Sequence, residues 1–321
     1  MKNKILILAG DPNSINSEII FKVWKKSDIS TKNKLFLVAN YNLMNKQFKK
    51  LKSSISLIKV KKLNDKLQTK KLKVIDIPLK FKDPFNVSLK NSKQYIIRSL
   101  NLAHKLAEKK EIKGFINCPI DKKLLSNSKK EGVTEFLASK CKISKDSEVM
   151  LIHNKKLSVV PLTTHININK VSKKLDINLI IKKMNTLQKQ FIKLFKKKPK
   201  IGILGLNPHN AEFTKDSEEV KIIIPAILRL KKKGFHINGP LSADTLFIDN
   251  YKKYDVIVGM YHDQVLAPFK TLFKFDGINI TLGLNYLRVS PDHGPAKDLI
   301  KKNQANYLSL LSSIKFFNNF T

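Results

Sequence analysis

Short apolar runs rich in Val, Ile and Leu alternate with amphipathic helical patterns along the whole chain of 321 residues. Such runs, when turn-forming residues flank them, are typical of buried strands. The alternation therefore predicts an α/β protein with mixed sheets. A membrane span needs about 18 consecutive apolar residues. No stretch of the sequence approaches that length, so we expect no contact with a membrane.

Three of the apolar runs lead into a histidine. His165 ends the segment LSVVPLTTH, His209 lies in IGILGLNPHN, and His262 lies in YDVIVGMYHDQ. Ligands collect at the carboxyl ends of parallel strands, and neutral imidazole is the commonest metal ligand, so these three side chains are candidates for one metal site. A single histidine after a strand is more often a hydrogen-bonded loop residue, and the spacing matches no local metal motif. Spacing alone leaves both interpretations open.

The formal net charge of +37 would ordinarily point to nucleic acid. The basic residues are almost all lysines spread along the chain, and only Arg98, Arg229 and Arg288 are arginines. Nucleic-acid sites favour arginine for bidentate contacts, so we expect no specific nucleic-acid partner, only weak attraction to polyanions or acidic metabolites. Cys118 and Cys141 are too few for a disulfide framework and fit a reducing cytoplasm.

Several polar segments that follow the apolar runs resemble the 4-hydroxythreonine-4-phosphate dehydrogenase family of vitamin B6 (pyridoxine) biosynthesis. These segments are GVTEF (132–136), TTH (163–165), GLNPHNAE (205–212), NGPLSADTLF (238–247), MYHDQVLAPFK (260–270) and GINITLGLNYLRVSPDHGPA (277–296). The resemblance implies a two-lobed fold of the isocitrate/isopropylmalate dehydrogenase type, with a cleft between the lobes. We expect residues 1–125 plus 277–321 to form lobe I and residues 126–276 to form lobe II, which carries most metal and substrate residues. It also implies a cytoplasmic homodimer with the active site at the dimer interface.

The family oxidises 4-phosphooxy-L-threonine, and the 3-keto acid product loses carbon dioxide to give 3-amino-2-oxopropyl phosphate. The resemblance therefore implies an oxidoreductase that uses NAD and a divalent metal, although the sequence leaves NAD and NADP open. On the family's pattern the metal ligands are His165, His209 and His262. Zinc suits three imidazoles best, and manganese, cobalt and magnesium remain open.

The resemblance also implies contacts with the small phosphorylated substrate and with the cofactor. The substrate contacts are Thr134, Lys270, Asn279 and Arg288, and the cofactor contacts in the stretch PDHGPAKDL are His293, Gly294 and Ala296. As catalytic residues we expect Lys270, which supplies positive charge, together with Asp244 and Asp263. The two aspartates either orient ligand imidazoles or accept the hydroxyl proton, and solvated loop aspartates are the alternative.

The chain departs from the family's pattern in a few places. Val133 replaces a histidine that contacts the substrate, and the first loop reads GDPNSIN where the family has glycines and a proline. The segment IKKN (300–303) replaces a small, glycine-rich one. These changes keep open a dehydrogenase for a phosphorylated threonate-like acid or a cis-dihydrodiol, and a metal-binding homologue that has lost catalysis.

Overall fold

The computed structural model describes residues 4–63, 70–125, 132–144 and 146–319. The chain divides into two compact units. Unit 1 comprises residues 1–141 and 284–321, and unit 2 comprises residues 142–283. No helix in the described ranges is long and apolar enough to cross a membrane.

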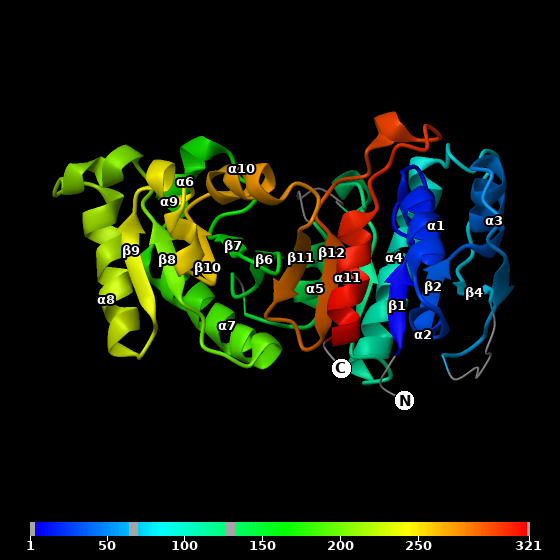
Figure 1. Cartoon of the computed structure of the whole chain (residues 1–321), viewed down its shortest axis with the longest axis horizontal. Coiled ribbons are helices and arrows are strands. Elements are labelled where there is room, and N and C mark those ends of the chain that lie inside the picture. Colours follow the sequence, from blue (N-terminus) through cyan, green and yellow to red (C-terminus); the bar gives the residue numbers. More distant parts are fainter. Residues whose placement is uncertain (1–3, 64–69, 126–131, 145, 320–321) are drawn as a thin grey trace. The chain divides into compact units, whose positions relative to one another are not determined.

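A parallel sheet forms the centre of unit 1 (Figure 1). Its strands, in spatial order, are β3 (Leu57–Lys59), β4 (Leu72–Asp76), β2 (Leu35–Ala39), β1 (Ile5–Leu8), β5 (Gly114–Asn117) and β12 (Leu287–Pro291). Every neighbouring pair in this order is parallel. Every residue of the central strands β1, β2 and β5 is buried, which explains why the sequence shows continuous apolar runs here rather than alternation.

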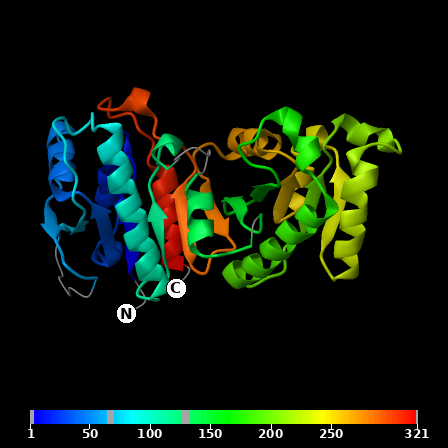
Figure 2. The same ribbon diagram turned by 180° about the vertical axis from the view of Figure 1, so that it is seen from behind.

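Helices cover both faces of the sheet of unit 1. They are α1 (Asn16–Lys26), α2 (Ile29–Lys34), α3 (Tyr41–Lys50), α4 (Leu89–Glu108), α5 (Val133–Lys140) and α11 (Leu308–Asn319). Figure 1 shows α1 and α11 in front of the strands, and Figure 2, seen from behind, shows α4 in front of them. Helix α4 begins after Ser88, whose hydroxyl accepts a hydrogen bond from the backbone N–H of Asn91.

Unit 2 contains a mixed sheet. Its strands, in spatial order, are β11 (Ile278–Leu282), β6 (Val149–His153), β7 (Ser158–Pro161), β10 (Val256–Gly259), β8 (Ile201–Leu204) and β9 (Ile237–Leu241). β6 is antiparallel to both β11 and β7, so β6 and β7 form a hairpin. The pairs from β7 to β9 are parallel, so the carboxyl ends of these four strands lie along one edge.

The helices of unit 2 follow these strands. They are α6 (Val171–Lys174), α7 (Ile177–Phe195), α8 (Ile224–Lys232), α9 (Ala243–Leu246) and α10 (His262–Phe273). In Figure 1, α6, α9 and α10 lie at the upper edge of the sheet of unit 2, where β7, β9 and β10 end. Helix α7 packs on β6 and β11, and α10 packs on β7 and β10.

The apolar pattern did not predict three of these elements. Strand β9 has the sequence INGPL, in which Asn, Gly and Pro are all unfavourable in strands. Strand β12 carries a buried arginine, and α10 contains Pro268 in its interior. Tertiary packing overrides the local signal in each case.

Candidate functional site

The three strand-end histidines lie along one edge of the sheet of unit 2. β10 lies between β7 and β8, and Val258 is aligned with Val160 on one side and with Ile203 on the other. His165 follows the end of β7, His262 follows β10, and His209 follows β8. The three carboxyl ends are therefore immediate neighbours in the order β7, β10, β8.

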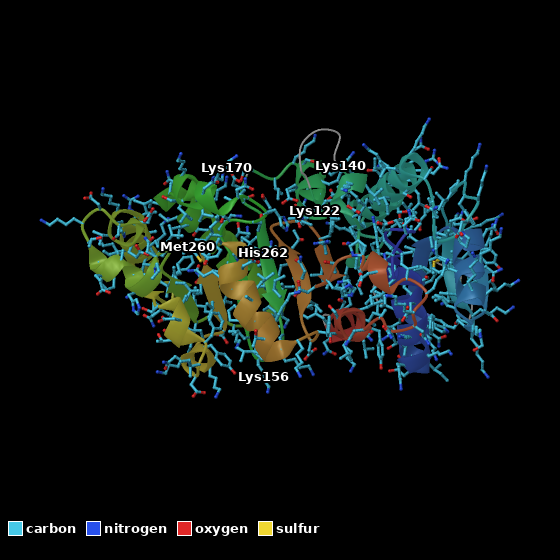
Figure 3. All side chains as sticks on the ribbon, turned by 90° about the horizontal axis from the view of Figure 1, so that it is seen from above. Lys122, Lys140, Lys156, Lys170, Met260 and His262 are labelled. Atoms are coloured by element: carbon cyan, nitrogen blue, oxygen red, sulfur yellow. The ribbon has the colours of Figure 1, made fainter. Side chains whose placement is uncertain are left out.

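His165 and His262 lie close together, with ring centroids 5.6 Å apart. Figure 3 shows His262 at the beginning of α10, next to Met260 at the end of β10. The Nδ1 atom of His262 is 2.7 Å from Oδ1 of Asp263. A carboxylate on one ring nitrogen orients the imidazole and leaves Nε2 for a metal, an arrangement common around bound zinc.

Of the two candidate catalytic aspartates, only Asp263 contacts a histidine. Asp244 lies exposed on α9, where Oδ1 accepts a hydrogen bond of 2.9 Å from the backbone N–H of Thr245. No hydrogen bond or ion pair within the described part of the chain joins Asp244 to a histidine. The sequence assigns Asp244 and Asp263 the same candidate roles, but in the structure only Asp263 is hydrogen-bonded to a candidate metal ligand within the described residues.

The backbone at two of the histidines is in the left-handed region. His165 has a φ of 46° and His209 a φ of 50°, and left-handed residues continue from His209 to Phe213. This conformation costs a non-glycine residue about 1–2 kcal/mol, so the surrounding structure must hold it in place. Such strain is concentrated at active sites and ligand clamps.

Hydrogen bonds join the three histidine-bearing loops to one another. The hydroxyl of Thr163, after β7, donates to the carbonyl of Met260 at 2.7 Å. The side chain of Gln264 accepts from the N–H of Met260 and donates to the carbonyl of Gly205, both at 2.7 Å. Sequence reasoning missed Gln264, although it lies in the segment MYHDQ that supported the family resemblance.

A buried carboxylate holds the loop that carries His209. Glu219, in the π-helical turn Glu219–Ile223, is fully buried. Its Oε1 accepts hydrogen bonds from the backbone N–H groups of Leu206 and Asn207 at 2.7 and 2.8 Å. Its Oε2 accepts from the Asn207 side chain at 3.0 Å. A carboxylate that accepts several N–H groups makes strong, charge-assisted bonds, so Glu219 fixes the start of the GLNPH segment.

The donors of this edge fit a divalent cation. Three neutral imidazoles on neighbouring strands supply a ligand set typical of zinc, and open positions remain for a substrate. His165 and His209 are exposed, and His262 is half-buried. Among the described residues, the three imidazoles do not form a set whose ligand atoms all lie within 4.8 Å of one another. They are an open group of donors rather than a closed cage.

The other residues assigned to the substrate fall in both units. In unit 2, Lys270 is exposed near the end of α10, and Asn279 is half-buried on β11. No hydrogen-bond partner within the described residues reaches the buried Oδ1 atom of Asn279.

In unit 1, Thr134 lies half-buried in the first turn of α5, and Arg288 is buried on β12. The Nε of Arg288 donates to Oδ1 of Asn117 at 2.7 Å. Burial lowers the pKa of Arg288 to about 10, and the carboxylate of Glu135 opposes that shift. The guanidinium is therefore charged at neutral pH and is held in place by its neighbours.

The candidate cofactor loop of unit 1 lies beside the first loop of the chain. The N–H of Ile15 donates to the carbonyl of Pro295 at 3.2 Å. Pro295 belongs to the same loop as His293, Gly294 and Ala296, which the resemblance assigns to the cofactor. A Cβ atom added at Gly294 would meet no heavy atom within 4 Å, so open space borders this loop. The sequence analysis assigns the first loop no cofactor role, and in the structure this loop contacts the candidate cofactor loop at Pro295.

Charged groups surround these two loops. Lys297 forms an ion pair of 2.7 Å with Asp121, which follows β5. Burial raises the pKa of Asp11, in the first loop, to about 6, while Lys297 and a backbone hydrogen bond lower it. The charged groups at this edge of the parallel sheet can bind a polar ligand. Two features suit a dinucleotide in particular, namely the loop that contains His293, Gly294 and Ala296 and the open space beside Gly294.

Comparisons with known proteins agree with these observations. Residues 31–317 match the family described as "Pyridoxal phosphate biosynthetic protein PdxA". The chain is 35% identical over 322 residues to a 4-hydroxythreonine-4-phosphate dehydrogenase of Aquifex aeolicus, which covers 98% of this chain and 97% of the relative. A second relative of that description, from a Sulfurihydrogenibium species, is 34% identical over 97% of this chain and 96% of its own length.

A solved structure is also similar to the whole chain. The crystal structure of 4-hydroxythreonine-4-phosphate dehydrogenase from Klebsiella pneumoniae matches with a TM-score of 0.85 and 26% identity. The match covers 99% of each chain. This similarity confirms the α/β fold class with mixed sheets that the sequence predicts.

Proposed function

The chain belongs to the family of the pyridoxal phosphate biosynthetic protein PdxA, and from this membership we propose that it is an NAD-dependent dehydrogenase of 4-phosphooxy-L-threonine. The 3-keto acid formed by the oxidation would lose carbon dioxide and give 3-amino-2-oxopropyl phosphate for pyridoxal phosphate synthesis. The observation that carries the proposal is the row of three histidines at the ends of the neighbouring strands β7, β10 and β8.

The proposed metal ligands are His165, His209 and His262. A divalent cation held there supplies the positive charge that favours loss of the proton from a substrate hydroxyl. Asp263 holds the ring of His262 in one orientation. Gln264 and Glu219 hold the loops in position, so they act through the ligands and are positioning residues.

The charged side chains support binding of a phosphorylated acid. Lys270 and Arg288 supply positive charge, and the fork of Arg288 is suited to a carboxylate or phosphate. Asn279 offers an amide whose oxygen is available for a donor. NAD would bind at the loop that contains His293, Gly294 and Ala296, and it accepts the hydride when bound.

One departure from the family affects substrate choice. Val133 is the first residue of α5, next to Thr134, and its side chain can neither donate a hydrogen bond nor carry charge. A phosphorylated threonate-like acid or a cis-dihydrodiol is therefore the alternative substrate class. A homologue without catalysis is the remaining alternative.

The test is formation of NADH by the purified chain with 4-phosphooxy-L-threonine, NAD and a panel of divalent metals. We expect turnover that a chelator abolishes and that zinc, manganese or cobalt restores. His209→Ala should lose turnover and the metal ion of the three-histidine site. His236→Ala is the matched control, because His236 is an exposed histidine just before β9 and belongs to no proposed site.

Each alternative predicts a different result. Turnover of a threonate-like acid or a cis-dihydrodiol, without turnover of 4-phosphooxy-L-threonine, would assign the chain to a related dehydrogenase. Metal binding without NAD binding or any turnover would leave a homologue without catalysis. Retention of the full metal content in His209→Ala would refute the three-histidine site itself.

A further inference from the structure

A second group of metal-ligating side chains lies in unit 1, away from the three histidines. His104 and Glu108 are one turn apart near the end of α4, and Cys141 follows the last residue of α5. One nitrogen, one oxygen and one sulfur ligand atom of these residues all lie within 4.8 Å of one another. Among the described residues, no other group of three such ligands meets this distance.

The buried Tyr286 lies beside this group. Its buried hydroxyl is 3.0 Å from Nδ1 of His104, and the two rings are in edge contact with centroids 5.8 Å apart. Tyr286 also lies next to the thiol of Cys141. His104 and Cys141 therefore both lie next to Tyr286.

The carboxylate of Glu108 is available to a cation. The chain has 62 lysines and arginines against 25 aspartates and glutamates, so basic side chains greatly outnumber the carboxylates. Glu108 nevertheless forms no ion pair with any described residue. Its Oε1 only accepts a long hydrogen bond of 3.4 Å from the side chain of Asn285.

We propose that His104, Glu108 and Cys141 bind a zinc ion. Thiolate, imidazole and carboxylate are the three ligand types that zinc takes in proteins, and a fourth position remains for water. The thiolate and the carboxylate together neutralise the charge of Zn²⁺. On binding, the sulfur–hydrogen bond of Cys141 is replaced by a sulfur–zinc bond, and the proton leaves to solvent.

The position of the site indicates a structural role. Cys141 is the last residue before the chain leaves unit 1, and Tyr286 follows closely after the chain returns at Leu284. A bound ion would therefore tie the chain segment at Cys141 to the end of α4. Because ligands that bind only the folded chain stabilise it, zinc should raise the unfolding temperature of unit 1 through this site.

Cobalt provides a direct test, because Co²⁺ bound to a thiolate gives a charge-transfer band in the near ultraviolet and Co²⁺ bound only to histidines does not. The full-length chain, freed of metal by a chelator, is titrated with Co²⁺. We expect the thiolate band in the unchanged chain and its loss in Cys141→Ser. His104→Asn should weaken cobalt binding at this site by at least about tenfold.

Two controls separate this site from the three-histidine site. His209→Ala should keep the thiolate band, and His236→Asn should keep both the band and the metal content. Zinc content by mass spectrometry should fall by one ion per chain in Cys141→Ser and, independently, in His209→Ala. Circular dichroism confirms that the variants are folded.

Two outcomes would overturn the proposal. One is the absence of a thiolate band at saturating Co²⁺ in the folded, reduced chain. The other is a band that persists in Cys141→Ser, which would assign the sulfur ligand to Cys118, although that thiol is fully buried. Neither outcome depends on dehydrogenase activity.

Discussion

Replacement of Gln264 by leucine tests whether the hydrogen-bonded loops position the metal ligands. In the native chain, the side-chain amide of Gln264 pairs with the N–H of Met260 and with the carbonyl of Gly205. Leucine has nearly the same size but pairs with neither group. Met260 and Gly205 are both buried, so two backbone groups lose their partner.

The expected cost follows from the number of groups left unpaired. A buried backbone group without a partner costs about 1–3 kcal/mol, so Gln264→Leu should destabilise unit 2 by about 2–6 kcal/mol. Since the two loops carry His262 and His209, the zinc affinity of Gln264→Leu should fall by roughly 10- to 100-fold.

Denaturant unfolding measures the stability, and competition with a chromophoric chelator measures the zinc affinity. The affinity is measured in chains that also carry Cys141→Ser, so that only the three-histidine site is counted. Gln47→Leu is the matched control, because the buried Gln47 also bridges two loops, through Pro12 and Pro84 of unit 1. It should lower stability and leave zinc affinity unchanged. Unchanged zinc affinity in Gln264→Leu would refute the reasoning.

Three further predictions concern charged groups. Because burial raises the pKa of Asp11 from 3.8 to about 6, the folded chain keeps a proton that the unfolded chain has lost, and stability falls by about 2 kcal/mol as the pH rises from 4 to 6. Asp11→Asn should remove this loss in denaturant unfolding across that range, whereas the exposed Asp298→Asn should not. Burial lowers the pKa of His153 from 6.5 to about 4, so the unfolded chain takes up its proton first. The free energy of unfolding then falls by about 3 kcal/mol as the pH falls from 6.5 to 4. An NMR titration in which the His153 ring of the folded chain is already protonated at pH 6 would contradict the lowered pKa. Arg288→Lys should weaken binding of 4-phosphooxy-L-threonine at least about tenfold in calorimetry, because the point charge of an ammonium replaces the two-pronged guanidinium. The affinity for NAD should stay the same. An equal loss of affinity for both ligands would count against a substrate contact.

Much of the architecture follows from local sequence. The apolar runs at 5–8, 35–39, 114–117 and 256–259 are strands because a parallel strand buried on both faces needs continuous apolar residues. The helix over 177–195 begins at the cap Asp176 and buries the apolar face that its spacing predicts. Strands β9 and β12 carry no such signal, since their Gly, Pro and Arg residues are stabilised only by the neighbouring strands.

The candidate site was likewise predicted from the sequence only in part. The sequence by itself determined which side chains end the strands, because the order of residues places His165, His209 and His262 directly after apolar runs. Only the tertiary structure decided that β10 lies between β7 and β8, and that Gln264 and Glu219 hold the loops. It also brought Cys141 to His104 and Glu108 on α4. Strand order and contacts between distant segments depend on packing across the whole chain, and a local pattern carries no information about partners so far away in sequence.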